Sequence, residues 1–302
     1  MILWLYSVVS SVIVTVILGL GLTMLARRKL KNSSTPLRKV NWEEDVVYLI
    51  QFPCVPKVRS ISPFSLKVET WLRLNKIKYE NIYSLKFGSK GQIPCIELNG
   101  KEIPDSNVIL DKLEKHFKVP EIHNASKKSV AHAVTVMLEN HTAKIGFYWR
   151  YGHHMKEFAF KVCHDTFPKK ALKFWKLFQP TGTKVTTYFH GLGRHSLDEM
   201  TNFSCQDLEA ISNLVSDKKF FHGEEASRID CTIFGHLAQF LYIPMDFPQK
   251  KFLLSSCDNL VKYVDRVKEL LWPDWEHMCT QGCMEGFMGK DYQDAIMKER
   301  KT

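Results

Sequence analysis

The segment Ser62-Pro63-Phe64-Ser65 has the spacing of a reactive turn but carries hydroxyl groups where such a turn carries sulfur. A Cys-Pro-aromatic-Cys turn at the start of an amphipathic helix presents a thiolate, because the helix N-terminus lowers the pKa of the thiol. A serine at position 62 cannot form a mixed disulfide. Its hydroxyl can still donate a hydrogen bond to a ligand thiol, so that the ligand becomes the nucleophile. The structural alternative is that Ser62 only caps the helix that begins at Pro63.

The pattern around this turn alternates strands and helices. A β-branched and aromatic run predicts a buried strand, and apolar residues at helical spacing after the turn predict an amphipathic helix. A second strand follows, then a hairpin turned at Asn99-Gly100 and another amphipathic helix. The predicted elements cover residues 45–52, 64–75, 77–84, 93–106 and 106–117. This order of strand, helix, strand, hairpin and helix is the thioredoxin-like plan.

From residue 124 onward the apolar residues repeat at helical spacing, with almost no alternation. One such predicted helix carries Ile229 and Ile233 on its apolar face. We therefore predict an α/β plus all-α fold, with a thioredoxin-like domain at 45–120, a helical domain at 124–275 and a tail at 276–302.

The N-terminal segment is apolar enough to cross a membrane. Residues 2–26 contain no charged side chain, and a helix of that length spans a hydrocarbon core of about 30 Å. We predict a single transmembrane helix at 1–26. A cleaved signal peptide is the alternative, but the segment lacks the basic start and the small residues of a cleavage site.

A basic juxtamembrane linker follows at 27–44. Its lysines and arginines lie between Arg27 and Lys39, and no acidic residue precedes Glu43. Positive charge beside a span stays on the cytoplasmic side and suits anionic headgroups, so we expect membrane lipid as a partner and the bulk of the chain in the cytosol. Four Asn-X-Ser/Thr sequons leave a lumenal orientation as the alternative. The sequence does not distinguish a lysosomal, mitochondrial outer or endoplasmic reticulum membrane.

Other classes of function find little support in the composition. The net charge of +10 comes mostly from the linker, and no basic–aromatic stripe accompanies it, so no nucleic-acid partner is expected. Eight cysteines at irregular spacings indicate a reducing compartment rather than a disulfide framework. His277, Cys279 and Cys283 are close in sequence, but a tetrahedral site needs four converging ligands, so no metal is expected. Cys54 lies beside basic residues that could lower its pKa.

Several long segments resemble known proteins. "SPFSLKVETWLRLNKIKYE", "GQIPCIEL" and "IPDSNVI" resemble the N-terminal half of glutathione transferases, and "FHGEEASRIDCTIFGHLAQFL" resembles their helical half. The run "YLIQFPCVPKVRSISPFSLKVETWLRLNKIKYEN", with "KGQIPCIELNGKEIPDSN", is similar to the failed-axon-connections family, which includes cadmium-responsive proteins and lies near the metaxins. The resemblance covers about Asp45 to Trp275. It implies a glutathione-transferase-type helical domain at 124–275.

The resemblance also implies a ligand site around the turn. In transferases a cis X-Pro bond exposes a backbone that pairs with the cysteinyl part of glutathione, which implies a cis Ile93-Pro94 bond here, although a turn proline is the alternative. Asp105 and Ser106 stand where transferases hold an acidic-Ser pair that grips the γ-glutamyl group, and both are also good helix caps. Ser62 stands where omega-type transferases keep a nucleophilic cysteine.

Ser227 and Asp230 have the spacing of a helix capping box. In transferases this box opens a core helix and serves folding, so we expect a structural role. Its loss should cost about 0.5–2 kcal/mol of stability.

The segment from Tyr79 to Pro94 departs from the transferase pattern. Transferases place a longer segment there, and the helix within it forms one wall of the glutathione pocket. Here only 15 steps separate the two residues. We therefore expect a shortened wall.

These features lead to two hypotheses. The first is a membrane-anchored glutathione-transferase-like protein that binds glutathione or another thiol ligand, in the stress, cadmium-response or detoxification role that the resemblance implies. If it is an enzyme, Ser62 activates the ligand thiol. The alternative is a non-catalytic, metaxin-like docking or scaffold module with protein partners at an organelle membrane, or a role in axon development.

Overall fold

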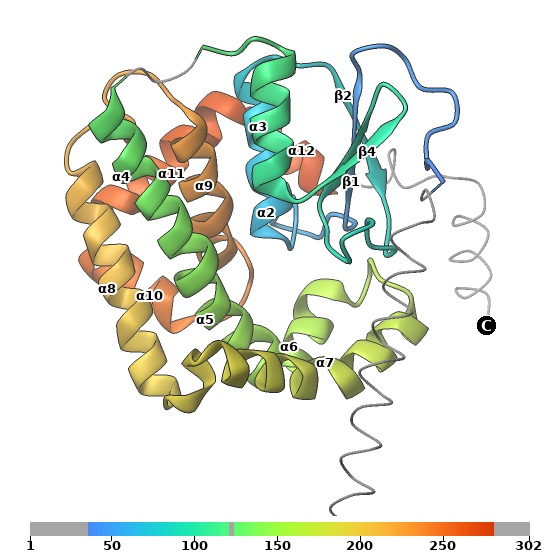
Figure 1. The fold of residues 1–302 in the computed structure, drawn as a ribbon. Coiled ribbons are helices and arrows are strands. Elements are labelled where there is room, and N and C mark those ends of the chain that lie inside the picture. Colours follow the sequence, from blue (N-terminus) through green and yellow to red (C-terminus); the bar gives the residue numbers. More distant parts are fainter. Residues whose placement is uncertain (1–35, 121–123, 281–302) are drawn as a thin grey trace, which may run out of the picture.

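The computed structural model describes residues 36–120 and 124–280 (Figure 1). The predicted anchor at 1–26, the first half of the basic linker and the tail beyond residue 280 lie outside the described residues. Within the described ranges, no helix combines the length and the apolar character that crossing a bilayer needs. The anchor therefore stays a prediction.

A four-stranded sheet forms the first domain, in the order β2-β1-β3-β4. The β1–β2 pair is parallel, and the β1–β3 and β3–β4 pairs are antiparallel. The hairpin turns at Asn99-Gly100, where both residues have positive φ, as the sequence predicts. The elements are β1 (Val47–Gln51), α2 (Pro63–Leu74), β2 (Tyr79–Tyr83), β3 (Cys95–Leu98), β4 (Lys101–Pro104) and α3 (Ser106–His116). The predicted thioredoxin-like plan is confirmed.

Alternate side chains of the sheet pack against α2 and α3, which lie on the same side of it (Figure 1). Leu49 of β1 and Ile96 of β3 are fully buried with Trp71 of α2 and Leu110 of α3. This arrangement follows from the period of two along a strand, which turns every second side chain toward the same face. The opposite, outer face of the sheet needs a different cover.

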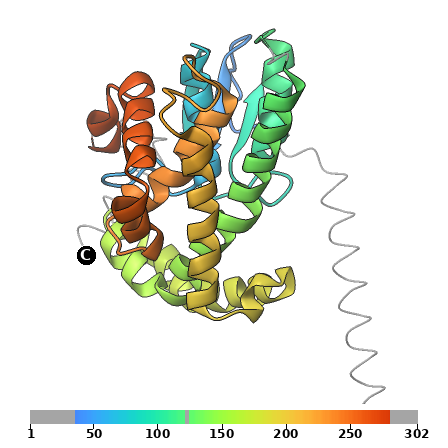
Figure 2. The same cartoon turned by 90° about the vertical axis from the view of Figure 1, so that its left-hand side faces the viewer.

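The second domain is helical, as predicted. Two π-helical turns, at 138–142 and 148–153, connect α4 to α5 and α5 to α6, and a third, at 159–163, extends α6. The helices are α4 (Ala125–Met137), α5 (Ala143–Phe147), α6 (Met155–Phe158), α7 (Lys169–His190), α8 (Leu197–Val215), α9 (Arg228–Leu241), α10 (Pro248–Ser256), α11 (Asp258–Leu271) and α12 (Trp275–Thr280). Figure 2 looks onto α4, α8 and α11, and in both views α7 lies at the lower edge of the molecule.

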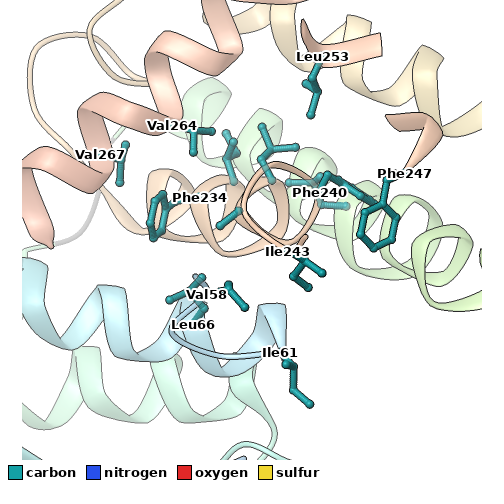
Figure 3. Packing of buried hydrophobic residues seen from close by; sticks show 14 of the residues in the cluster. Val58, Ile61, Leu66, Phe234, Phe240, Ile243, Phe247, Leu253, Val264 and Val267 are labelled. Carbon is teal, nitrogen blue, oxygen red and sulfur yellow. The ribbon is translucent and has the colours of Figure 1, made fainter. Parts of the chain in front are cut away.

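Helix α9 is the centre of the larger core and ties the two domains together. Every residue from 229 to 240 is buried. Figure 3 shows Phe234 between Leu66 of α2 and Val264 and Val267 of α11. Because this cluster includes residues of both domains, the groove between them is packed with side chains.

Gly235 allows α9 to approach the first turn of α2. A Cβ atom at this position would lie 2.7 Å from the carbonyl oxygen of Pro63 and 2.9 Å from the backbone nitrogen of Lys67. Any other residue would force the two helices apart. The start of α2, where the predicted reactive turn lies, is therefore fixed against the helical domain.

Candidate functional site

Ser62 is the N-cap of α2 and is largely buried. Its Oγ accepts a hydrogen bond from the N–H of Ser65 at 3.3 Å, and its own N–H donates to Oγ of Ser60 at 3.3 Å. Pro63 takes the first helical position, where its missing N–H costs nothing. The structure thus places the Ser62 hydroxyl as a helix cap.

The Ile93-Pro94 peptide bond is cis, as the sequence predicts. It leads directly into β3, whose first residue, Cys95, pairs with Ile50 of β1. This connection sets the backbone of Ile93 at the edge of the sheet domain.

Asp105 and Ser106 begin α3. Asp105 has φ of +78°, a left-handed conformation that is uncommon for a residue with a Cβ. Its carboxylate accepts hydrogen bonds from the N–H groups of Asn107 at 3.0 Å and Val108 at 3.2 Å. The cap is therefore Asp105, and Ser106 is the first helical residue.

These predicted ligand groups present little surface. Ser62, Ile93 and Ser106 are exposed by 7%, 8% and 6%. A hydroxyl or backbone group can recognise a ligand only where the ligand can reach it, and a tripeptide must contact several such groups at once. Three of the predicted ligand residues, Ser62, Ile93 and Ser106, are therefore largely covered, whereas Asp105 is partly exposed.

Three polar side chains close the junction between α2, α3 and the helical domain. Lys67 Nζ donates to Glu139 Oε1 at 2.6 Å and to Asn107 Oδ1 at 2.9 Å, and Asn107 Nδ2 donates to Glu139 Oε2 at 2.6 Å. Burial lowers the pKa of Lys67, and the nearby Glu139 carboxylate opposes that shift. This cluster was not predicted, because the sequence of an amphipathic helix does not distinguish a charged residue that becomes buried from one that stays exposed.

A second buried polar cluster lies beneath α2. Glu69 accepts hydrogen bonds from Arg59 at 3.0 Å, from Gln51 at 2.7 Å and from Asn81 at 2.8 Å. The Arg59 and Glu69 side chains are fully buried. The cluster fixes the loop before α2 to the sheet, and it was not predicted either.

A small cavity lies beside the start of α2. It has a volume of about 20 Å³, and its accessible wall is apolar. Pro63, Gly146, Phe147, Arg150 and His236 are among the residues that line it. A space of this size holds about one water molecule, whereas pockets for organic ligands measure about 300–1,000 Å³. This cavity cannot hold glutathione.

The predicted shortening of the pocket wall is confirmed, since residues 84–92 form a loop without a helix. The segment that precedes β1 covers the outer face of the sheet instead. The backbone N–H groups of Arg38 and Lys39 donate to the Glu97 carboxylate at 2.8 and 3.0 Å, and Arg38 Nη2 donates to the carbonyl oxygen of Phe87 at 3.0 Å. Two cations of the predicted lipid-binding linker are therefore bound to the protein itself, with Lys39 paired to Glu80.

The described thiols do not form a reactive or metal-binding group. Burial raises the pKa of Cys95, Cys163 and Cys279 to about 12, so they carry no negative charge at neutral pH. Cys54 is buried and disulfide-bonded rather than a free thiol, which goes against both the reactive role considered for it and the reducing compartment expected from the cysteine spacings. Across residues 36–120 and 124–280, no three potential ligand side chains converge as a metal ion would need. Cys283 lies outside these residues.

The predicted capping box of α9 is confirmed. Asp230 Oδ2 accepts hydrogen bonds from the N–H of Ser227 at 2.7 Å and from its hydroxyl at 2.8 Å. The other carboxylate oxygen accepts from the N–H of Phe221 at 2.7 Å and from the Tyr263 hydroxyl. Asp230 thus joins the helix start to a loop and to α11, which the sequence pattern alone does not indicate.

Comparison with known protein families gives two matches within the chain. Residues 63–157 match the model of the glutathione S-transferase N-terminal domain, and residues 205–267 match that of the glutathione S-transferase C-terminal domain.

Two individual proteins are similar to this chain, one over most of its length and the other over a shorter segment. Failed axon connections of Drosophila melanogaster is 38% identical over 264 residues, which cover 81% of this chain and 62% of that protein. A metaxin-1 homolog of Caenorhabditis briggsae is 32% identical over 82 residues, covering 27% of this chain and 26% of that protein. In both cases the match spans less than two thirds of the relative's length.

Among solved structures, a glutathione S-transferase of Ceriporiopsis subvermispora in complex with glutathione superposes with a TM-score of 0.53. It is 15% identical, and the match covers 74% of this chain and 97% of that one. This likeness establishes the fold.

Proposed function

On the premise that the chain belongs to the glutathione-transferase-like, metaxin-related family that includes failed axon connections, we propose that it is a membrane-tethered docking protein rather than a transferase. The observation that supports this proposal most directly is the burial and the hydrogen bonding of Ser62. Ser62, which would activate a ligand thiol, is only 7% exposed, and its hydroxyl oxygen already caps α2.

The closed junction between the domains supports this proposal. A transferase needs an open groove for glutathione and its electrophile, whereas Lys67, Asn107 and Glu139 join the two walls directly. A docking role needs only a stable fold and an outer surface. The organelle and the partner proteins stay predictions, as do the cytosolic orientation, the cadmium response and the role in axon development.

Glutathione binding without catalysis is the second candidate, and one observation favours it. The Asp105-Ser106 pair stands at the start of α3, where the family resemblance places the grip on glutathione, and the Ile93-Pro94 bond is cis, as that resemblance implies. In this reading the buried groups become accessible when the ligand enters.

Thermal unfolding of the full chain in detergent, with and without glutathione, tests both candidates. A ligand at 100 times its dissociation constant stabilises a protein by about 2.7 kcal/mol. We expect no shift at glutathione concentrations up to about 10 mM and no conjugation of a chlorodinitrobenzene substrate above the uncatalysed rate. A shift that Ser106→Ala abolishes, and that the exposed control Ser255→Ala keeps, would replace docking with glutathione binding.

The tether needs a separate experiment. We expect the full chain to resist extraction from membranes at alkaline pH, and its folded part to be digested by protease added to the cytosolic side. Extraction without detergent would contradict the anchor, and protection of the folded part in intact organelles would reverse the orientation.

A further inference from the structure

Helix α7 has two opposite faces, and one of them is largely left exposed by the part of the chain that the structure describes. Its buried side chains Leu172, Thr183 and Thr187 recur along one side, at a helical rotation of about 100° per residue. The other side carries large apolar side chains that all lie in solvent: Phe174, Leu177, Phe178, Val185, Tyr188 and Phe189. By the same rotation these six centre on the side directly opposite the buried one.

The exposure of these side chains is high for residues of their kind. Phe189 is 79% exposed and Leu177 is 66% exposed. Single exposed apolar residues are ordinary on a protein surface, but an apolar stripe of six on one side of a helix, in two groups separated by Thr181 and Gly182, indicates a surface that another molecule or a membrane covers. Helix α7, which carries these residues, lies at the lower edge of the molecule (Figures 1 and 2), and its half-buried Trp175 packs against Phe52, directly after β1.

The charge around the stripe has a single sign. The sequence contains no aspartate or glutamate from residue 166 to residue 197, whereas α7 carries five lysines: Lys169, Lys170, Lys173, Lys176 and Lys184. All five are exposed, and none forms an ion pair with a residue that the structure describes. By the same rotation Lys173 and Lys184 lie between the buried side and the apolar residues, and the other three lysines border them on the same flank, so that flank is cationic.

We propose that α7 is a lipid-binding helix that lies in the headgroup region of an anionic bilayer, with its aromatic stripe inserted at the boundary of the acyl chains. Helices that bind membrane interfaces combine an apolar face rich in Phe and Leu with lysines that reach the phosphates. The long lysine stems can lie along the membrane surface while their ammonium groups contact headgroups. Most backbone groups in the helix interior satisfy one another, but Pro180 has no N–H, so the carbonyl oxygen of Lys176 lacks its usual helical donor.

This contact is independent of the predicted anchor. It rests on the exposure and charge of described residues, and it would orient the folded domains on a membrane rather than merely keep them near one. An α7 that docks on a second copy of the chain or on another protein is the competing outcome, and the experiment separates them.

Amide hydrogen exchange of the full chain in vesicles tests the proposal. The chain is reconstituted in vesicles of phosphatidylcholine alone and in vesicles with about 30 mol% phosphatidylserine. We expect exchange and protease cleavage within residues 169–190 to slow by at least about three-fold in the anionic vesicles, and the effect to weaken in high salt.

Two double variants provide the matched comparison. Phe174→Glu with Phe178→Glu places charge in the stripe and should abolish the protection. Leu254→Glu with Leu270→Glu changes two leucines that are equally exposed on α10 and α11 and should preserve it. Unchanged thermal melting of both variants shows that they fold.

Three outcomes would overturn the proposal: equal exchange of α7 in both lipids, protection that persists in Phe174→Glu with Phe178→Glu, or protection in detergent that rises with protein concentration. Flotation of the vesicles reports the anchor separately. A chain that fails to insert but whose α7 is protected by added anionic vesicles would contradict the tether and support the lipid-binding helix.

Discussion

Arg38 Nη1 lies 3.1 Å from Glu102 Oε2, so the segment that follows the predicted anchor is fastened to the outer face of the sheet. Arg38 lies twelve positions after Ala26, and a fully extended chain of that length reaches about 40 Å. If the anchor spans the membrane, the sheet domain stays within that distance of the bilayer. A short tether of this kind favours the contact that we propose for α7.

Removal of Arg38 should release this segment. Burial alone would raise the pKa of Glu102, but hydrogen bonds from Ser89 and Arg38 outweigh it and lower that pKa, so the carboxylate is charged and binds the guanidinium. Because hydrogen bonds to charged groups contribute about 1.5–3 kcal/mol, we expect Arg38→Ala to lose about 2 kcal/mol of stability. Exchange of the Lys39 amide should rise at least ten-fold, a change of about 1.4 kcal/mol or more.

Arg266→Ala is the control for this change, since Arg266 donates to the carbonyl oxygen of Lys219 in the helical domain. Unchanged exchange at Lys39 in Arg38→Ala would show that the backbone bonds to Glu97 hold the segment without the side chain.

The Lys67–Glu139 pair should show strong coupling between the two domains. The ammonium is fully buried, so Lys67→Met alone leaves the Glu139 carboxylate without its partner and should cost about 3–5 kcal/mol. Replacement of both, as Lys67→Met with Glu139→Leu, removes both charges and should restore most of that loss. Urea unfolding of the two single variants and the double variant measures the coupling, and additive losses would disprove it.

The two members of the α9 capping box should differ in their effect. Asp230 accepts four hydrogen bonds and is fully buried, so Asp230→Asn should destabilise the fold by about 3 kcal/mol. Ser227→Ala removes only the cap and should cost about 1 kcal/mol. Chemical denaturation compares them, and equal losses would mean that the bonds to Phe221 and Tyr263 contribute nothing.

Acid should destabilise the protein through His236. Burial lowers the pKa of this imidazole to about 4 from its usual 6.5, with Glu139 opposing and Lys67 assisting the shift. Its Nδ1 is 2.9 Å from the carbonyl oxygen of Thr232, and its buried Nε2 has no partner among the described residues. A proton on Nε2 would therefore be unsolvated in the folded state.

The unfolded chain takes up this proton below pH 6.5 and the folded chain only near pH 4, so stability should fall as the pH drops through that window. The loss should approach about 3 kcal/mol, since each unit of pKa difference corresponds to about 1.4 kcal/mol. His236→Phe should remove this part of the pH dependence in urea unfolding between pH 7 and pH 4.5. An unchanged slope would assign the acid sensitivity to other groups.

The order of elements follows from local patterns and was predictable. The β-branched and aromatic run of β1, the Asn99-Gly100 turn, the apolar face of α2 and the spacing of Ser227 and Asp230 are properties of short segments, and each led to the correct local structure. The family resemblance added the cis bond at Pro94, which no local pattern requires. The helix cap at Ser62 could also be predicted from a short segment of the sequence.

The tertiary structure decided whether those residues form a usable site. Residues 70 or more positions apart meet where Lys67 pairs with Glu139 and where α9 approaches α2 at Gly235. The folded protein also buries Ser62 and Ser106. Arg38 illustrates the same point, since its charge suggests a lipid contact in sequence but meets Glu102 across the sheet. Sequence periodicity determines which face of an element is apolar. Only the packing of distant elements determines which faces are covered, because the neighbours that bury a residue can lie far from it in the sequence.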